Sequence, residues 1–135
     1  MKTGSSSSKD LYYTKDHEWI RFEGPVAYTG ICSYQLIGFR NIDQIVFYDL
    51  TGFKKRGDKI ASIRYKDYRI IAHMPVDGEI LEVNNNLVSG NPNTLLQQPE
   101  NSGWISLIKP TRPDERGGLL LPKEYQLNSK STDAK

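Results

Sequence analysis

The stretch Gly57–Ile80, GDKIASIRYKDYRIIAHMPVDGEI, decides the fold of this chain. Its two apolar runs, IASIRY and RIIAHMP, face each other across a short polar tip and predict a tight β-hairpin. The Asp-Gly pair that follows signals a turn into one further strand, EILEV. The tip itself holds one lysine, Lys66, next to Asp67. The hairpin therefore raises the question of whether Lys66 is a site of covalent modification or only a surface charge.

The rest of the chain also favours short strands. WIRFEG and WISLIKP alternate apolar and polar residues, and VAYTGI and QIVFYDL are rich in β-branched and aromatic residues. Helical signals are few. Leu36, Phe39 and Ile42 recur at a spacing of three, with Ser33 as a possible N-cap, and PNTLLQQ predicts a single helical turn. Many short strands punctuated by Gly and Pro indicate a small β-sandwich or barrel-like fold.

Length and composition set the class of protein. A chain of 135 residues predicts one domain, which we place at residues 11–110. The serine-rich residues 1–10 are expected to be a disordered tail or linker, and residues 111–135 a weakly helical or disordered extension. No apolar run is long enough for a membrane span, and the N-terminus lacks a secretory signal and shows no evident transit peptide. The one cysteine, Cys32, excludes an intrachain disulfide and fits a reducing compartment.

Signals of catalysis are missing from the sequence. His17 and His73 have no partner at metal-ligand spacing, so each is expected to be a hydrogen-bonded structural histidine. There is no nucleophile elbow, no phosphate loop and no suggestive carboxylate pair. We therefore expect a protein that is not an enzyme.

Basic residues crowd the segment from Lys54 to Arg69, with tyrosines among them. Such a mixture can hold phosphates and stack bases, but it is also typical of a solvated turn that protects a strand edge. The net charge is only +2, so a nucleic-acid binder is the weakest of our hypotheses.

Taken in order, the motifs resemble the H protein of the glycine cleavage system. YTKDHEWIRFEG is similar to that family's opening strand, and YTGICSYQLIG and QIVFYDL are similar to the segments that follow it. KKRGDKIASI and MPVDGEILEVNNNL resemble the two sides of its lipoyl hairpin, and NPNTLLQQPENSGWISLIKP its late segment. The resemblance implies a mainly β fold, the lipoyl/biotinyl-like flattened β-barrel sandwich with short flanking helices.

The resemblance also implies a role. H proteins are carriers rather than enzymes, and a lysine at their hairpin tip is amide-linked to lipoic acid. The lipoyl arm collects the aminomethyl group of glycine and delivers it to a tetrahydrofolate-dependent partner. A tight hairpin suits this work, because it presents one side chain on a rigid backbone.

This sequence departs from the family at the tip itself. The family motif reads Glu-Ser-Val-Lys-Ala, with the lysine ten residues after a glycine and eight before a proline. Counting from Gly57 and from Pro75 gives Asp67 both times, so Asp67 occupies the lysine position and Lys66 lies one residue early. Arg64 stands where the family has glutamate.

Two main hypotheses follow from this departure. The first is an H-protein-like module without the lipoyl arm and without a cofactor, which binds or regulates proteins of glycine cleavage or lipoate metabolism. The second is a working carrier with lipoate on Lys66, because a turn residue one place early can still project outward. Arg64, Tyr65, Tyr68 and Arg69 are the expected contacts of the tip with a protein partner. We expect a cytoplasmic protein, or one of the mitochondrial matrix in a eukaryote.

Overall fold

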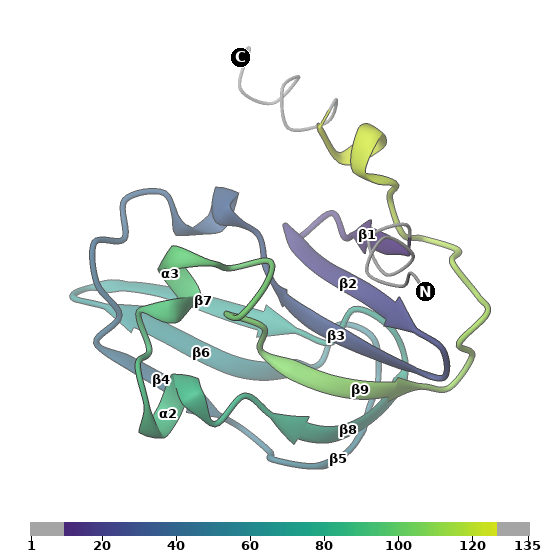
Figure 1. The fold of residues 1–135 in the computed structure, drawn as a ribbon, viewed down its shortest axis with the longest axis horizontal. Helices are drawn as coiled ribbons and strands as arrows, with labels where there is room; N and C mark the ends of the chain where they lie inside the picture. Colours follow the sequence, from purple (N-terminus) through teal and green to yellow (C-terminus); the bar gives the residue numbers. More distant parts are fainter. Residues whose placement is uncertain (1–9, 127–135) are drawn as a thin grey trace, which may run out of the picture.

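The computed structural model describes residues 10–126 of the chain (Figure 1). Except for Asp10, the tail expected over residues 1–10 lies outside the described residues. The last part of the extension expected over residues 111–135 does so too.

One sheet contains six antiparallel strands. In sheet order they are β1 (Leu11–Tyr13), β2 (Glu18–Glu23), β3 (Val26–Ile31), β9 (Ser106–Pro110), β8 (Gly78–Val83) and β5 (Gly52–Lys54). The second sheet contains three strands in the order β4 (Gln44–Phe47), β6 (Lys59–Tyr65) and β7 (Tyr68–His73). Seven of these strands agree with the runs predicted from sequence, because alternating side chains bury one face of each strand. The short strands β1 and β5 were not predicted; the segment that contains β5 reads from its sequence as a charged turn.

The two sheets pack face to face around one apolar core. The core takes Ile20, Phe22 and Ile108 from the first sheet and Ile63 and Ile70 from the second. Burial of apolar area on this scale is the main stabilising contribution to such a fold. The predicted mainly β sandwich is therefore confirmed, although its two sheets stay separate and do not close into a barrel.

Three short helical elements lie between strands. They are the 3-10 turn η1 (Ser33–Leu36), α2 (Asn86–Ser89) and α3 (Thr94–Gln97). The predicted N-cap at Ser33 is wrong: Cys32 takes that position, and no side chain caps the turn. The turn is also shorter than the apolar spacing suggested: it ends at Leu36, Ile37 is already extended with a ψ of 127°, and Gly38 then turns the chain with a φ of +93°.

The segment after β9 returns to the first strand of the sheet. Tyr13 and Leu120 exchange two backbone hydrogen bonds, of 2.8 and 2.7 Å. Residues 122–126 are helical, and the ring of Tyr125 stacks on that of Tyr13 at 4.4 Å between centroids. The described part of the C-terminal segment is thereby joined to the sandwich (Figure 1).

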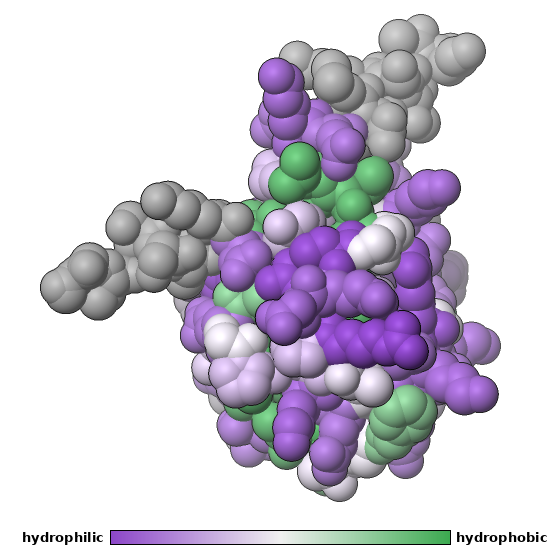
Figure 2. Space-filling view, turned by 90° about the vertical axis from the view of Figure 1, so that its right-hand side faces the viewer, coloured by the Kyte–Doolittle hydropathy of each residue, from purple (hydrophilic) through white to green (hydrophobic). Residues whose placement is uncertain are grey.

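The β6–β7 turn lies at the left end of the molecule in Figure 1. Figure 2 looks onto the other end, where hydrophilic residues cover most of the face and hydrophobic residues gather beneath the C-terminal segment. Within residues 10–126, no helix is long and apolar enough to cross a membrane.

Candidate functional site

The hairpin turns at Lys66–Asp67, as a two-residue connection between β6 and β7. Tyr65 pairs with Tyr68 across the two strands, and Arg64 pairs with Arg69. Both turn residues are exposed. The structure thus places at one tip all six residues that the sequence singled out.

Lys66 is fixed at the apex of this turn by two contacts. Its backbone adopts a φ of +54°, a left-handed conformation that is uncommon for a residue other than glycine. Its amide N–H donates to Asp43 Oδ2 at 2.8 Å, and its ammonium nitrogen lies 5.3 Å from the centroid of the Tyr65 ring. The amide contact holds the pKa of Asp43 below its usual value, with the nearby Arg64 and Lys66 charges as smaller causes. The ammonium thus lies over the ring of its own hairpin.

An aromatic cluster supports the tip from the inner face of the hairpin. The Tyr65 and Tyr68 rings are nearly parallel, with centroids 6.5 Å apart, and Phe39 packs on both. Tyr65 is buried, whereas Tyr68 is 62% exposed. Sequence reasoning left open whether these tyrosines brace the tip or present a contact surface. Tyr65 does the first, and Tyr68 is placed for the second.

The outer face of the hairpin carries the two arginines. Arg64 and Arg69 are both exposed, and Arg64 donates to Gln44 Oε1 at 3.3 Å. Neither arginine forms an ion pair with any residue in the described range 10–126. The tip therefore presents positive charge on one side and an exposed tyrosine on the other.

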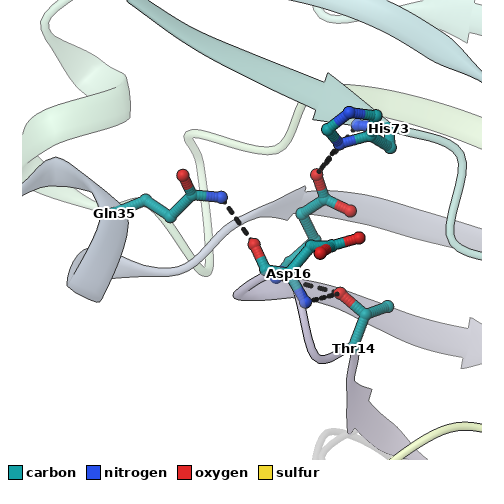
Figure 3. Close-up of polar contacts among 5 residues, drawn as sticks. Thr14, Asp16, Gln35 and His73 are labelled. Atoms are coloured by element: carbon teal, nitrogen blue, oxygen red, sulfur yellow. Dashed lines mark hydrogen bonds and ion pairs between the residues drawn. The ribbon is translucent and has the colours of Figure 1, made fainter. Parts of the chain in front are cut away.

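A second polar group lies at the far end of β7, where the chain leaves the hairpin (Figure 3). Glu18, at the start of β2, is buried, and its Oε2 is hydrogen-bonded to the backbone N–H and to Nδ1 of His73, both at 2.9 Å. Burial raises the pKa of Glu18 to about 7, and the hydrogen bonds from His73 oppose that shift. Thr14 Oγ1 accepts from the amides of Asp16 and Glu18 and so holds the loop between β1 and β2.

The ligand atoms of Asp16, Glu18 and His73 lie within 4.8 Å of one another, so these residue types could hold a metal ion. The buried carboxylate is already hydrogen-bonded twice by His73, and we assign this group a structural role that joins β2 to β7. As expected from the sequence, both histidines are hydrogen-bonded: His17 Nδ1 lies 2.8 Å from the Tyr125 hydroxyl.

Three residues that shape the hairpin tip and the Glu18–His73 group were not predicted from the sequence. Asp43 reaches the tip from 23 residues away, and Glu18 reaches His73 across 55 residues. Phe39 was expected only as part of a helical face. No local pattern signals such distant contacts: Asp43 reaches the tip because β4 pairs with β6, and Glu18 reaches His73 where the two sheets meet.

Comparisons with known proteins agree with this architecture. The family model described as "Glycine cleavage H-protein" matches residues 11–132. The chain belongs to the glycine cleavage H-protein family. A Thermoanaerobacter sp. (strain X514) H protein is 33% identical over 116 residues, which covers 86% of this chain and 90% of that protein. The mitochondrial H protein of Pisum sativum is 33% identical over 127 residues, or 92% and 74% of the two chains.

A solved structure supports the same assignment. The crystal structure of an H protein from Mycobacterium marinum matches with a TM-score of 0.78 and 25% identity, covering 90% of this chain and 98% of that one. The H-protein resemblance drawn from the motifs is therefore confirmed, and with it the fold. The β6–β7 tip holds the candidate site residues of the chain, from Arg64 to Arg69.

Proposed function

We propose that this chain is an H-protein-like module that has lost the lipoyl arm and acts by binding proteins of glycine cleavage or lipoate metabolism. The observation that carries the proposal is the geometry of the tip. Asp67 fills the second position of the turn, and the only lysine of that turn, Lys66, is one residue early with its ammonium against Tyr65.

The chemistry of attachment supports this proposal. A lipoyl amide forms between a carboxyl group and an amine, so the Asp67 carboxylate cannot carry the arm. In the family the residue three positions before the lysine is a glutamate, and here that position is Arg64, exposed beside Arg69. An enzyme that recognises an acidic tip has a basic contact surface. The two arginines would repel that surface and lower both the affinity and the association rate.

The docking part of the proposal rests on what the chain retains. The family model matches residues 11–132, and H proteins from Thermoanaerobacter and Pisum sativum are 33% identical to this chain, so the fold on which docking surfaces are built is retained. A module with this surface and without the lipoyl arm would bind the partners of an H protein but could not carry the aminomethyl group. In a bacterial cell this proposal places the protein in the cytoplasm, and in a eukaryotic cell in the mitochondrial matrix.

The second candidate is a lipoylated carrier that uses Lys66. One observation favours it: Lys66 is exposed at the apex of a two-residue turn, where side chains point away from the body. A flexible four-carbon stem could leave Tyr65 at small cost, since an exposed cation–π contact is worth only about 0.5–1 kcal/mol.

A reconstituted glycine cleavage reaction with an ordinary lipoylated H protein tests the proposal. We expect this chain alone to support no turnover, and an excess of it to raise the apparent KM for the lipoylated H protein while kcat stays constant. Turnover with this chain alone would establish the carrier instead. An unchanged apparent KM for the lipoylated H protein would show that this chain does not dock on the glycine cleavage enzymes.

Two exposed aromatics give a matched pair of variants for this assay. Tyr68→Ser removes a side chain that is 62% exposed at the tip, and Phe53→Ser removes one that is 59% exposed on the other sheet. We expect the first to weaken the competition and the second to leave it unchanged. Equal effects of both would show that the tip is not the docking surface.

A further inference from the structure

We infer that the outer face of the three-stranded sheet holds a binding site for a phosphate monoester. A depression of about 190 Å³ opens on this face. Its lining consists of Gln44, Val46, Tyr48, Ser62, Arg64 and Arg69. Lys66 and Asp67 are not part of it, so the inference holds whether or not Lys66 carries lipoate.

The strand register brings the key side chains into one row. Gln44 on β4 pairs with Arg64 on β6, and Arg64 pairs with Arg69 on β7. Because side chains of paired residues point to the same face, the three lie side by side across the sheet. The contact between Arg64 and Gln44 Oε1, at 3.3 Å, confirms that the first two meet. The row is built on three paired strands, which hold it more rigidly than a loop would.

The two arginines are an unfavourable pair in the protein alone. Like charges directly opposite each other on adjacent strands destabilise a sheet. No carboxylate lines the depression, and neither guanidinium has an ion-pair partner among the described residues. Asp43 interacts with the charge of Arg64 but accepts its hydrogen bonds from Lys66 and Asn41. An anion between the arginines would remove this repulsion.

The number of charges and donors selects the anion. A carboxylate has one charge and two oxygens, and a single guanidinium fork satisfies it. Two guanidinium groups with neighbouring hydroxyls of Tyr48 and Ser62 supply two charges and more donors than a carboxylate accepts. A phosphate monoester carries about −1.5 to −2 charges and three terminal oxygens. A phosphodiester, as in nucleic acids, carries only one charge and fits less well.

Val46 and Tyr48 add an apolar side to the site. They are 42% and 45% exposed, next to the arginine row. Such a wall would contact the organic part of the ligand, whether that is a small phosphorylated metabolite or the backbone beside a phosphorylated serine.

Titration followed by ¹⁵N–¹H NMR at low ionic strength tests the inference with three probes. Glycerol 3-phosphate stands for a metabolite, a glycine-flanked phosphoserine tripeptide for a phosphorylated protein, and acetate for a carboxylate. We expect saturable chemical-shift changes at Ser62, Arg64 and Arg69 with at least one phosphate probe. The phosphate probe that binds more tightly shows whether the natural ligand is a metabolite or a phosphorylated protein. No saturation with either phosphate, or equal affinity for acetate, would overturn the inference.

Variants separate this site from general attraction to a basic protein. Arg64→Gln and Arg69→Gln should each lower the affinity for the phosphate probe by about tenfold or more, as expected for a lost charge-assisted hydrogen bond. Arg40→Gln removes the same charge at another exposed position and should leave the affinity unchanged. Equal affinities in all three variants would contradict a site on this face.

Discussion

The ammonium nitrogen of Lys66 lies 5.3 Å from the centroid of the Tyr65 ring, on the hairpin that carries both residues. Tyr65 is itself buried and packs on Phe39. The lysine of the tip thus contacts its own hairpin, and its exposed neighbour Asp67 is the residue that we propose stands at the family's lysine position.

Asp43 should control the order of the turn. Asp43→Ala removes the acceptor of the Lys66 amide, and we expect that amide to exchange with solvent roughly threefold to tenfold faster, because a single hydrogen bond is lost. Solvent-exchange NMR measures this directly. Asp49→Ala, which removes the partner of Lys54 instead, is the control. Equal exchange of the Lys66 amide in both variants would show that Asp43 does not hold the turn.

Glu18 should titrate far above an ordinary glutamate. Burial raises its pKa from 4.5 to about 7, so the folded state binds this proton more tightly than the unfolded state does. The resulting stability is fully present below about pH 4.5 and is lost as the pH rises through about 7. We expect a carboxyl ¹³C midpoint near 7, and a fall in unfolding free energy across this window that Glu18→Gln flattens. A midpoint at the ordinary value would contradict the account of this buried group.

Gly30 should tolerate no side chain. A Cβ there would lie 2.5 Å from Cε2 of Trp19, a fully buried ring whose Nε1 donates to the Pro99 carbonyl at 2.9 Å. Gly30→Ala should therefore lower the free energy of unfolding by about 1–3 kcal/mol in urea titrations. Gly117→Ala, whose Cβ would meet nothing within 4 Å, should change it by less than about 0.5 kcal/mol. Similar effects of the two would mean that Trp19 can move aside.

Cys32 should be inert in the folded protein. The residue is 1% exposed, and burial raises the pKa of its thiol. We expect no reaction with an aromatic disulfide reagent under native conditions and one thiol per chain after unfolding. Rapid native labelling would place the thiol at the surface.

The hairpin and its flanking strands could be predicted because burial alternates along them. Ile63 and Ile70 face the core while Arg64 and Arg69 face solvent, which is the period-two pattern read from the sequence. The apolar spacing of Leu36 and Ile42 likewise marked buried residues, but not a helix. Spacing alone cannot distinguish a helix from a 3-10 turn followed by extended chain.

The contacts that give the tip its character were beyond prediction. The hairpin is contacted by three side chains from β4 and the segment before it: the Asp43 carboxylate, the Phe39 ring and the Gln44 amide. These contacts form only once that segment packs on the hairpin. The sequence did predict a hairpin with a short polar tip, and the structure places its turn at Lys66–Asp67, which the sequence had left open by one residue. That Asp67 stands at the family's lysine position stays a prediction, which rests on counting from Gly57 and Pro75.

The mass of the intact protein after co-expression with a lipoate ligase tests the central claim most directly. An ordinary H protein expressed in parallel shows that the ligase is active, and Asp67→Lys asks whether this hairpin accepts lipoate once the lysine is in place. We predict that the wild-type chain keeps its unmodified mass and that Asp67→Lys gains one lipoyl group. A lipoyl group on wild-type Lys66 would contradict the account and make this chain a carrier.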